Sequence, residues 1–214
     1  MNYNNNCMYI ESAKTPSIGY LLLYATNIGL SVMVAGFVLA GNTDLVDVWA
    51  AQNDWGDNKD RNNTAIASSG VLGLTIGSII SKMITDYGRR RSILLSFAVC
   101  SVVTIPYFFT SNFWVLLSTR LIMGFFSAIL INACSLYTAE TIPSENQSNV
   151  GTSINLGIVS GIFFNNLFGL LLPDNDDTDG LKNDNLWIVS YSLQLAPMIL
   201  SAILWLFVFR TEPI

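Results

Sequence analysis

The sequence predicts an all-α integral membrane protein with six transmembrane helices. Of its 214 residues, 51% are hydrophobic and only 12% are charged, whereas roughly 25% of the residues of an ordinary globular protein are charged. A membrane-spanning helix needs ~20 mostly apolar residues, and six stretches meet this requirement: 17–41, 65–84, 92–110, 113–139, 149–172 and 186–209. A basic turn, Gly88-Arg89-Arg90-Arg91, separates the second stretch from the third. Adjacent arginines are costly in lipid, so this turn lies outside the bilayer.

The first half of the chain supplies a tail and three of these helices. Residues 1–16 are polar and lack the basic start and short apolar core of a signal peptide. We therefore expect the helix over 17–41 to act as its own insertion signal. The helix over 65–84 carries a stripe of small residues at four-residue spacing, Ser69, Gly73, Gly77 and Ser81. Such a stripe lets two helix backbones approach closely in lipid.

The second half supplies the other three helices. The helix over 113–139 has Arg120 near one end and Glu140 just beyond the other, and Pro143 prevents the helix from continuing because proline lacks a backbone N–H. The helix over 149–172 repeats the stripe pattern at Gly157, Gly161, Asn165 and Gly169. Close helix packing is therefore predicted for this helix too. The helix over 186–209 completes the bundle.

The distribution of lysine and arginine predicts the orientation. Most of them fall on the side of the basic turn, at Lys14, Lys82, Arg89, Arg90, Arg91 and Arg210. The positive-inside rule makes this side cytosolic, so 1–16 is a cytosolic tail, both termini are cytosolic and the two aspartate-rich loops lie outside. The net charge of −5 reflects these loops and not an acidic partner surface. We expect a multi-pass protein of the plasma membrane, without a nucleic-acid partner. Asn62, in an Asn-Asn-Thr triplet of the first outer loop, is a candidate glycosylation site.

Missing residues exclude several kinds of chemistry. The chain contains no histidine, so neither a Ser-His protease nor a histidine-ligated zinc protease can be built from it. It has no phosphate-binding loop of the G-x-x-x-x-G-K type, and Cys7, Cys100 and Cys134 lack a zinc-binding spacing. We therefore expect no enzymatic activity, no metal site and no cofactor.

Polar side chains within the bilayer are candidates for function, because each is costly unless it is paired. Arg120 either extends to the outer interface or forms a pair or gate with another helix; Glu140 lies about 30 Å away along the same helix, too far to pair with it. Amides lie within helices at Asn27, Asn132, Asn155, Asn165 and Asn166. Each amide either binds a neighbouring helix or offers hydrogen bonds to an uncharged, hydroxylated solute. No carboxylate lies in the middle of a helix, which argues against a proton relay.

Several motifs together resemble the sugar-porter branch of the major facilitator superfamily, over residues 17–214. Gly88-Arg89-Arg90 resembles the turn between helices 2 and 3 of that family. The segment Arg120-Leu-Ile-Met-Gly124 is similar to the start of helix 4, and Tyr137-Thr-Ala-Glu140-Thr-Ile-Pro143 to its Y-x-x-E-x-x-P end. The segment from Asn155 to Ile162 resembles the helix 5 motif Q-L-x-I-x-x-G-I. Family members have two six-helix halves, so the resemblance implies the N-terminal half of a major facilitator fold.

The resemblance also implies roles for individual residues. Asn155 would replace the glutamine that contacts the sugar, with Ile158 and Ile162 beside it. Asn27 falls where proton-coupled members carry an aspartate and passive facilitators often carry an asparagine, and it is a further candidate sugar-binding residue. An ion-pair network or gate on the cytosolic side would contain Asp86, Gly88, Arg89, Arg90 and Glu140. On the outer side, Arg120 would form an ion pair or gate.

Three positions depart from the family pattern. Thr85 stands where the acidic residue of the helix 2–3 turn is usual, and Asp86 follows it. Gln147-Ser148 replaces an Arg-Gly pair after Pro143, which removes one arm of the cytosolic charge network. Ser135 replaces a proline. These departures affect the inferred substrate more than the fold.

The sequence therefore predicts a half or fragment of a sugar transporter, a hexose-type facilitator that works by alternating access in a lipid bilayer. Its partner would be a second six-helix half, from the same full-length chain or from a dimer partner. Two other hypotheses stay open: the same fold could carry a polyol or an organic ion, or the bundle could be a non-transporting membrane sensor or partner subunit.

Overall fold

The computed structural model describes residues 18–41, 45–170 and 186–209, and the segments of regular structure in these ranges are all helical. The predicted cytosolic tail 1–16 and the second acidic loop, which lies between the last two predicted spans, are outside the described residues. The helices are α1 Ile18–Ala40, α2 Val46–Gln52, η1 Gly56–Asn58, α3 Lys59–Thr85, α4 Arg89–Thr104, η2 Ile105–Phe108, α5 Phe113–Thr141, α6 Ser144–Gly169, α8 Leu186–Leu193 and α9 Leu195–Phe207.

Four of the described segments are long and apolar enough to cross a membrane: Ile18–Ala40, Gly56–Thr85, Arg89–Phe108 and Phe113–Thr141. The remaining two predicted spans correspond to α6, whose first half is polar, and to α8 with α9, where the helix is interrupted. The chain is thus an all-α bundle of membrane-spanning segments, as the sequence predicts.

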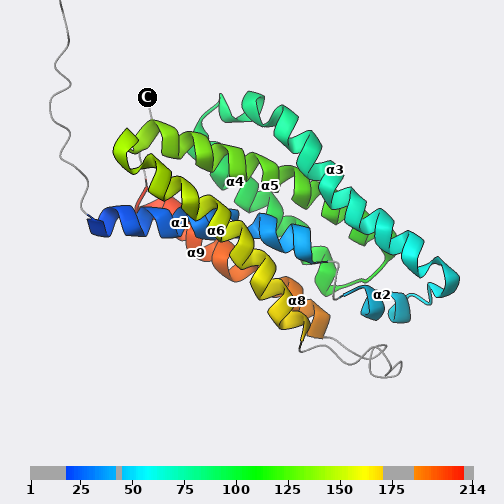
Figure 1. Cartoon of the computed structure of the whole chain (residues 1–214). Helices are drawn as coiled ribbons and strands as arrows, with labels where there is room; N and C mark the ends of the chain where they lie inside the picture. Colours follow the sequence, from blue (N-terminus) through cyan, green and yellow to red (C-terminus); the bar gives the residue numbers. More distant parts are fainter. Residues whose placement is uncertain (1–17, 42–44, 171–185, 210–214) are drawn as a thin grey trace, which may run out of the picture.

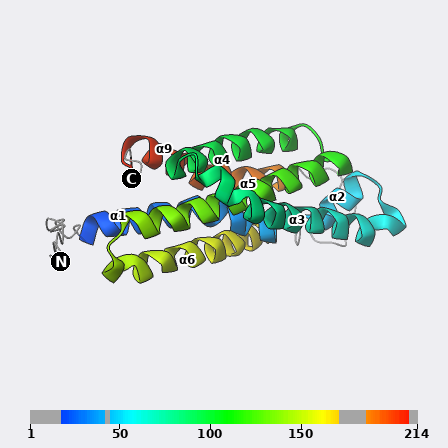
Figure 2. The same cartoon turned by 90° about the horizontal axis from the view of Figure 1, so that it is seen from above.

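The long helices form two layers. α3, α5, α1 and α6 pack side by side in this order, with the most extensive contacts between α3 and α5 and between α1 and α6. Behind this row, α4 packs on α5 and α9 packs on α1, and α4 and α9 contact each other (Figure 2). The start of α1 and the end of α9 lie at one end of the bundle, whereas α2 lies at the other (Figure 1). We call the first of these ends, where α4 begins at Arg89, the Arg89 end, and we call the second the α2 end.

The helix contacts follow the same pattern in the two halves of the chain. In the first half of the chain, the second and third helices, α3 and α4, both pack on α5. In the second half, the corresponding helices, α6 and α9, both pack on α1. Each three-helix unit thus packs its second and third helices on the first helix of the other unit, an arrangement expected where a bundle is built from two structural repeats.

Glycines produce the two closest helix contacts. A Cβ atom added to Gly73 or Gly77 would collide with the α5 backbone, at the carbonyl oxygens of Leu121 and Phe125 respectively. Between α1 and α6, a Cβ on Gly161 would collide with the carbonyl of Met33, and one on Gly36 with that of Ile158. The predicted stripes therefore act in helix packing, where close approach of two backbones replaces the hydrophobic effect as the source of association in lipid.

The helix boundaries differ from the sequence expectation at several places. The loop between the first two long helices, predicted to be outside, contains α2 and η1, and α3 begins at Lys59 instead of residue 65. Asn62 is consequently half-buried in the first turn of α3, and a helical setting argues against glycosylation, which favours surface loops. At α6 the helix begins at Ser144, ahead of the predicted apolar span, because polar residues can extend a helix beyond the bilayer.

Prolines account for two irregularities. Pro106 changes the end of the third span from α-helix to the 3₁₀ segment η2. Pro197 lies shortly after the break between α8 and α9 at Gln194. Its ring lacks an N–H and crowds the carbonyl four residues earlier, at Leu193, so the helix is interrupted there.

Candidate functional site

Three of the predicted sugar-contacting residues lie on one side of α6. At ~100° per residue, Asn155, Ile158 and Ile162 fall within an arc of about 60°. Asn155 is exposed, and the two isoleucines are half-buried. Ile158 and Ile162 lie beside the contact with α1, where Gly36 meets their backbone. Among the described residues, no hydrogen bond ties the Asn155 amide to another helix, so the side chain is available to a solute.

Asn27, the fourth predicted sugar-contacting residue, lies elsewhere. Its side chain is 1% exposed, and its Oδ1 accepts a hydrogen bond from Ser201 Oγ of α9 at 2.8 Å. Ser31 completes this contact, because its hydroxyl lies 2.7 Å from that of Ser201 and accepts from Trp205 Nε1 at 3.0 Å. Asn27 therefore joins α1 to α9 inside the bundle. The structure does not bring it together with Asn155.

A second amide also joins two helices. Asn132 Nδ2 of α5 donates to Ser81 Oγ of α3 at 2.8 Å. This is the interhelical hydrogen bond that an amide in lipid is expected to form. Asn132 therefore differs from Asn155, whose amide has no such partner in the described part of the chain.

Arg120 is buried near the α2 end of the bundle. Its side chain is 2% exposed, so it does not extend to the outer interface. Nη1 donates to the carbonyl of Val38 in the last turn of α1 at 2.5 Å. The last carbonyls of a helix have no partner within it and carry partial negative charge, so a buried cation suits this position.

An ion pair connects α4 to α5 at the Arg89 end. Arg89 donates to Glu140 Oε1 from Nη2 at 2.8 Å and from Nε at 3.1 Å. Gly88 makes this geometry possible, because the chain turns from α3 into α4 there with φ 135° and ψ 121°, a conformation that essentially only glycine adopts without strain. The structure thus brings together three members of the predicted cytosolic network.

The other two members of that network are placed differently. Arg90 was expected in an ion pair, but its Nε donates to the carbonyl of Phe209 at 2.8 Å and its Nη2 to that of Trp205 at 3.1 Å. It therefore caps the end of α9, whose final carbonyls attract a cation. Asp86 is exposed, and its side chain forms no hydrogen bond or ion pair within the described ranges.

Gln147 has a structural role that its sequence position does not reveal. It replaces an arginine of the family pattern, which suggested only the loss of a charge. In the structure, Nε2 donates to the carbonyls of Ala139 and Ile142, both at 2.9 Å. The amide therefore supplies donors to free carbonyls at the end of α5, next to Glu140, and it does this without adding a charge.

The Arg89–Glu140 pair should contribute only modestly to stability. Both side chains are 29% exposed, and partly solvated pairs are typically worth about 0.2–1 kcal/mol. In a double-mutant cycle with Arg89→Gln and Glu140→Gln, we expect a coupling energy in this range, measured by unfolding of the protein in detergent. Additive effects of the two substitutions would contradict the pairing.

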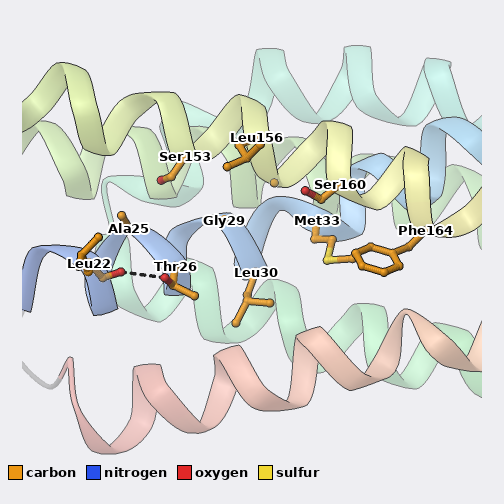
Figure 3. Close-up of a pocket in the computed structure, with 11 residues that line it drawn as sticks. Leu22, Ala25, Thr26, Gly29, Leu30, Met33, Ser153, Leu156, Ser160 and Phe164 are labelled. Carbon is orange, nitrogen blue, oxygen red and sulfur yellow. Dashed lines mark hydrogen bonds between the residues drawn. The ribbon is translucent and has the colours of Figure 1, made fainter. Parts of the chain in front are cut away.

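A pocket of about 330 Å³ lies between α1 and α6, on the opposite side of α6 from Asn155. Figure 3 shows that Leu22, Leu30, Met33 and Phe164 line this pocket. The Thr26 hydroxyl donates a hydrogen bond to the carbonyl of Leu22 in its own helix. A neighbouring pocket of about 380 Å³ shares Leu30, Met33 and Phe164 and continues toward α9. This mostly apolar groove offers few groups to a hydroxylated solute, so the candidate sugar site is the Asn155 side of α6.

Comparison with known proteins gives a consistent result. The family model for "Sugar (and other) transporter" matches residues 18–211. Hexose transporter 1 of Toxoplasma gondii is 30% identical over 155 residues, which is 70% of this chain and 27% of that protein. The facilitated glucose transporter member 1 of solute carrier family 2 from Gallus gallus is 29% identical over 137 residues, covering 62% of this chain and 26% of that protein.

Solved structures share the fold. The inward-open xylose transporter XylE from E. coli superposes with a TM-score of 0.72 at 18% identity, over 92% of this chain and 48% of that one. The described helices therefore have the fold of one six-helix half of a major facilitator transporter. The chain matches about a quarter of the length of the two curated relatives named above and about half of the solved transporter. With the family model matching nearly its whole length, the chain belongs to the sugar (and other) transporter family.

Proposed function

We propose that this chain forms one wall of a transporter that carries hexose-type sugars across a membrane by alternating access. The observation that carries the proposal is the exposed amide of Asn155 beside Ile158 and Ile162, in a chain related to hexose transporters. An amide can donate to and accept from sugar hydroxyls. The two isoleucines supply an apolar surface, as a small-molecule site usually does around a few polar groups.

The site needs a second wall. Asn155 lies on the outside of the described bundle, so a sugar bound there would be enclosed only by another set of helices. We assign this role to a second six-helix half, from the same full-length chain or a dimer partner. The two halves would rock around the bound sugar, and the Arg89–Glu140 pair would help to hold the Arg89 end closed in one state.

The proposed transporter is a passive facilitator and not an enzyme. Among the described residues, no aspartate or glutamate is buried. A carrier that moves protons with its substrate uses ionisable groups inside the membrane. We infer that this half moves sugar without taking up a proton.

Uptake of labelled hexoses into vesicles that contain the whole transporter tests the function. We expect saturable uptake that an unlabelled hexose competes with and that an imposed proton gradient changes little. Uptake competed by a polyol or an organic ion, but not by a hexose, would replace the proposed substrate. Binding without any uptake would favour a sensor.

We further propose that both termini are cytosolic and that the protein resides in the plasma membrane. Cysteines at exposed positions can test the orientation. Asp57→Cys, at the α2 end, should react with an impermeant reagent added outside cells, whereas Tyr87→Cys, 84% exposed in the wild type at the Arg89 end, should not. Ser92 lies near Tyr87 but is only 3% exposed, so it would be a poor reporter. The reverse labelling pattern would contradict the orientation.

A further inference from the structure

An exposed stripe runs along α6 and changes character at Asn155. Seven exposed residues of α6 lie within an arc of about 80° at ~100° per residue: Glu145, Ser148, Thr152, Asn155, Val159, Phe163 and Asn166. The residues between the Arg89 end and the middle of the helix are polar. Beyond Asn155 the next two are apolar, with Val159 60% exposed and Phe163 61% exposed.

Ser148 precedes the predicted apolar span of α6, whereas the exposed amide of Asn155 lies within it, where it is costly in lipid unless it is paired. α6 has 26 residues, yet it is not among the described segments that are apolar enough to cross a membrane. Polar side chains within a membrane protein face the protein interior or a water-filled cavity. Gly151 lies next to the stripe, and a Cβ added there would have no atom within 4 Å. There is therefore open space beside Asn155 on the side of the Arg89 end.

We propose that residues 148–155 line a water-filled approach to Asn155 and that Thr152 is a second sugar-contacting residue; this rests on the proposed function. Thr152 lies three residues before Asn155, about 4.5 Å along the helix axis. One sugar ring can therefore reach both side chains. Val159 and Phe163, the next two residues of the stripe beyond Asn155, are apolar and offer a sugar no hydrogen bond.

The chemistry of Thr152 complements that of Asn155. Its Oγ1 donates to the carbonyl of Ser148 at 2.9 Å, which fixes the hydroxyl and leaves its lone pairs directed away from that bond. Thr152 thus offers an acceptor to a sugar hydroxyl, whereas the Asn155 amide offers both donors and an acceptor. Together they favour a solute with neighbouring hydroxyl groups.

Cysteine labelling in the whole transporter tests the approach. Cys100 and Cys134 are buried, so the background carries Cys7→Ser, and reactive cysteines of the second half are replaced as well. Ser148→Cys, Thr152→Cys and Asn155→Cys should react with an impermeant reagent from the side that also reaches Tyr87→Cys. Ser160→Cys, in the apolar groove, should not react. If Ser148→Cys and Thr152→Cys are unreactive while Tyr87→Cys reacts, the water-filled approach is excluded, and the stripe packs against another helix.

A hexose should slow the labelling of both Thr152→Cys and Asn155→Cys. Thr152→Val should weaken hexose affinity ~2- to 13-fold, the range for one neutral hydrogen bond. Thr26→Val is a matched control, because Thr26 is exposed, bonds to its own helix in the same way and lines the apolar groove; it should leave affinity unchanged. Hexose protection of Asn155→Cys alone, with normal affinity of Thr152→Val, would overturn the role of Thr152 and leave the proposed function intact. Protection of neither cysteine would count against both.

Discussion

Replacing Gly161 by leucine should destabilise the protein by about 3 kcal/mol or more. A Cβ at this position would collide with the carbonyl of Met33 and lie 3.0 Å from the Cα atom of Gly36. The obstacle is helix backbone, which cannot rotate away like a side chain. Overpacking of a core by side chains alone costs about 1–3 kcal/mol, so displacement of α1 should reach or exceed the top of that range. Thermal unfolding in detergent measures the effect.

Gly151→Leu is the matched control for Gly161→Leu. Both glycines lie within α6, so both substitutions gain the same helix propensity, roughly 0.8 kcal/mol. Gly151 has nothing within 4 Å of an added Cβ. Its substitution should therefore leave the unfolding temperature unchanged or raise it. Equal destabilisation of the two variants would contradict the close packing of α1 on α6.

Removing the side chain of Arg120 should have an effect of similar size. The guanidinium is buried and donates to the carbonyl of Val38. Arg120→Ala would leave that acceptor without its donor, at about 1–3 kcal/mol, and would also create a cavity, since large-to-alanine substitutions in cores cost about 2–5 kcal/mol. We expect a loss of at least about 3 kcal/mol in the free energy of unfolding.

Arg91→Ala provides the comparison for Arg120→Ala, because Arg91 is exposed. Exposed substitutions of this kind usually change stability by no more than about 0.5 kcal/mol. Arg120→Lys should fall between the two, since lysine keeps the charge but not the planar donor group. If Arg120→Ala unfolds like the wild type and changes only the rate of transport, Arg120 is a gate and not a structural cap.

Sequence patterns predicted the long helices well and the short ones poorly. The apolar runs that became α1 and α5 have clear ends, and Pro143 defines one of them. By contrast, α2 has seven residues and no long apolar run, so hydropathy could not reveal it. The break at Gln194 depends on Pro197 within an otherwise apolar stretch. A proline in a membrane helix can kink it or interrupt it, and packing against other helices decides which.

The candidate site could be predicted where the position of a residue along its own helix decides which face it occupies. Asn155, Ile158 and Ile162 share a face because of helical periodicity alone. Arg90 could not be placed in this way, because its acceptors are backbone carbonyls at the end of α9, and any residue type can supply a carbonyl. Asn27 was similarly ambiguous, since only the packing of α9 on α1 brings Ser201 within reach.

Hexose affinity of an Asn155 variant tests the central claim most directly. In the whole transporter, Asn155→Ala should weaken sugar binding ~2- to 13-fold, the loss of one neutral hydrogen bond, without lowering the amount of folded protein. Asn155→Gln, which keeps the amide, should retain binding or change the preferred sugar. Asn132→Ala is the contrasting control, because it breaks the bond to Ser81 and should reduce stability more than affinity. Unchanged sugar affinity in Asn155→Ala, together with a reduced folding yield, would show that Asn155 holds helices together and does not bind the sugar.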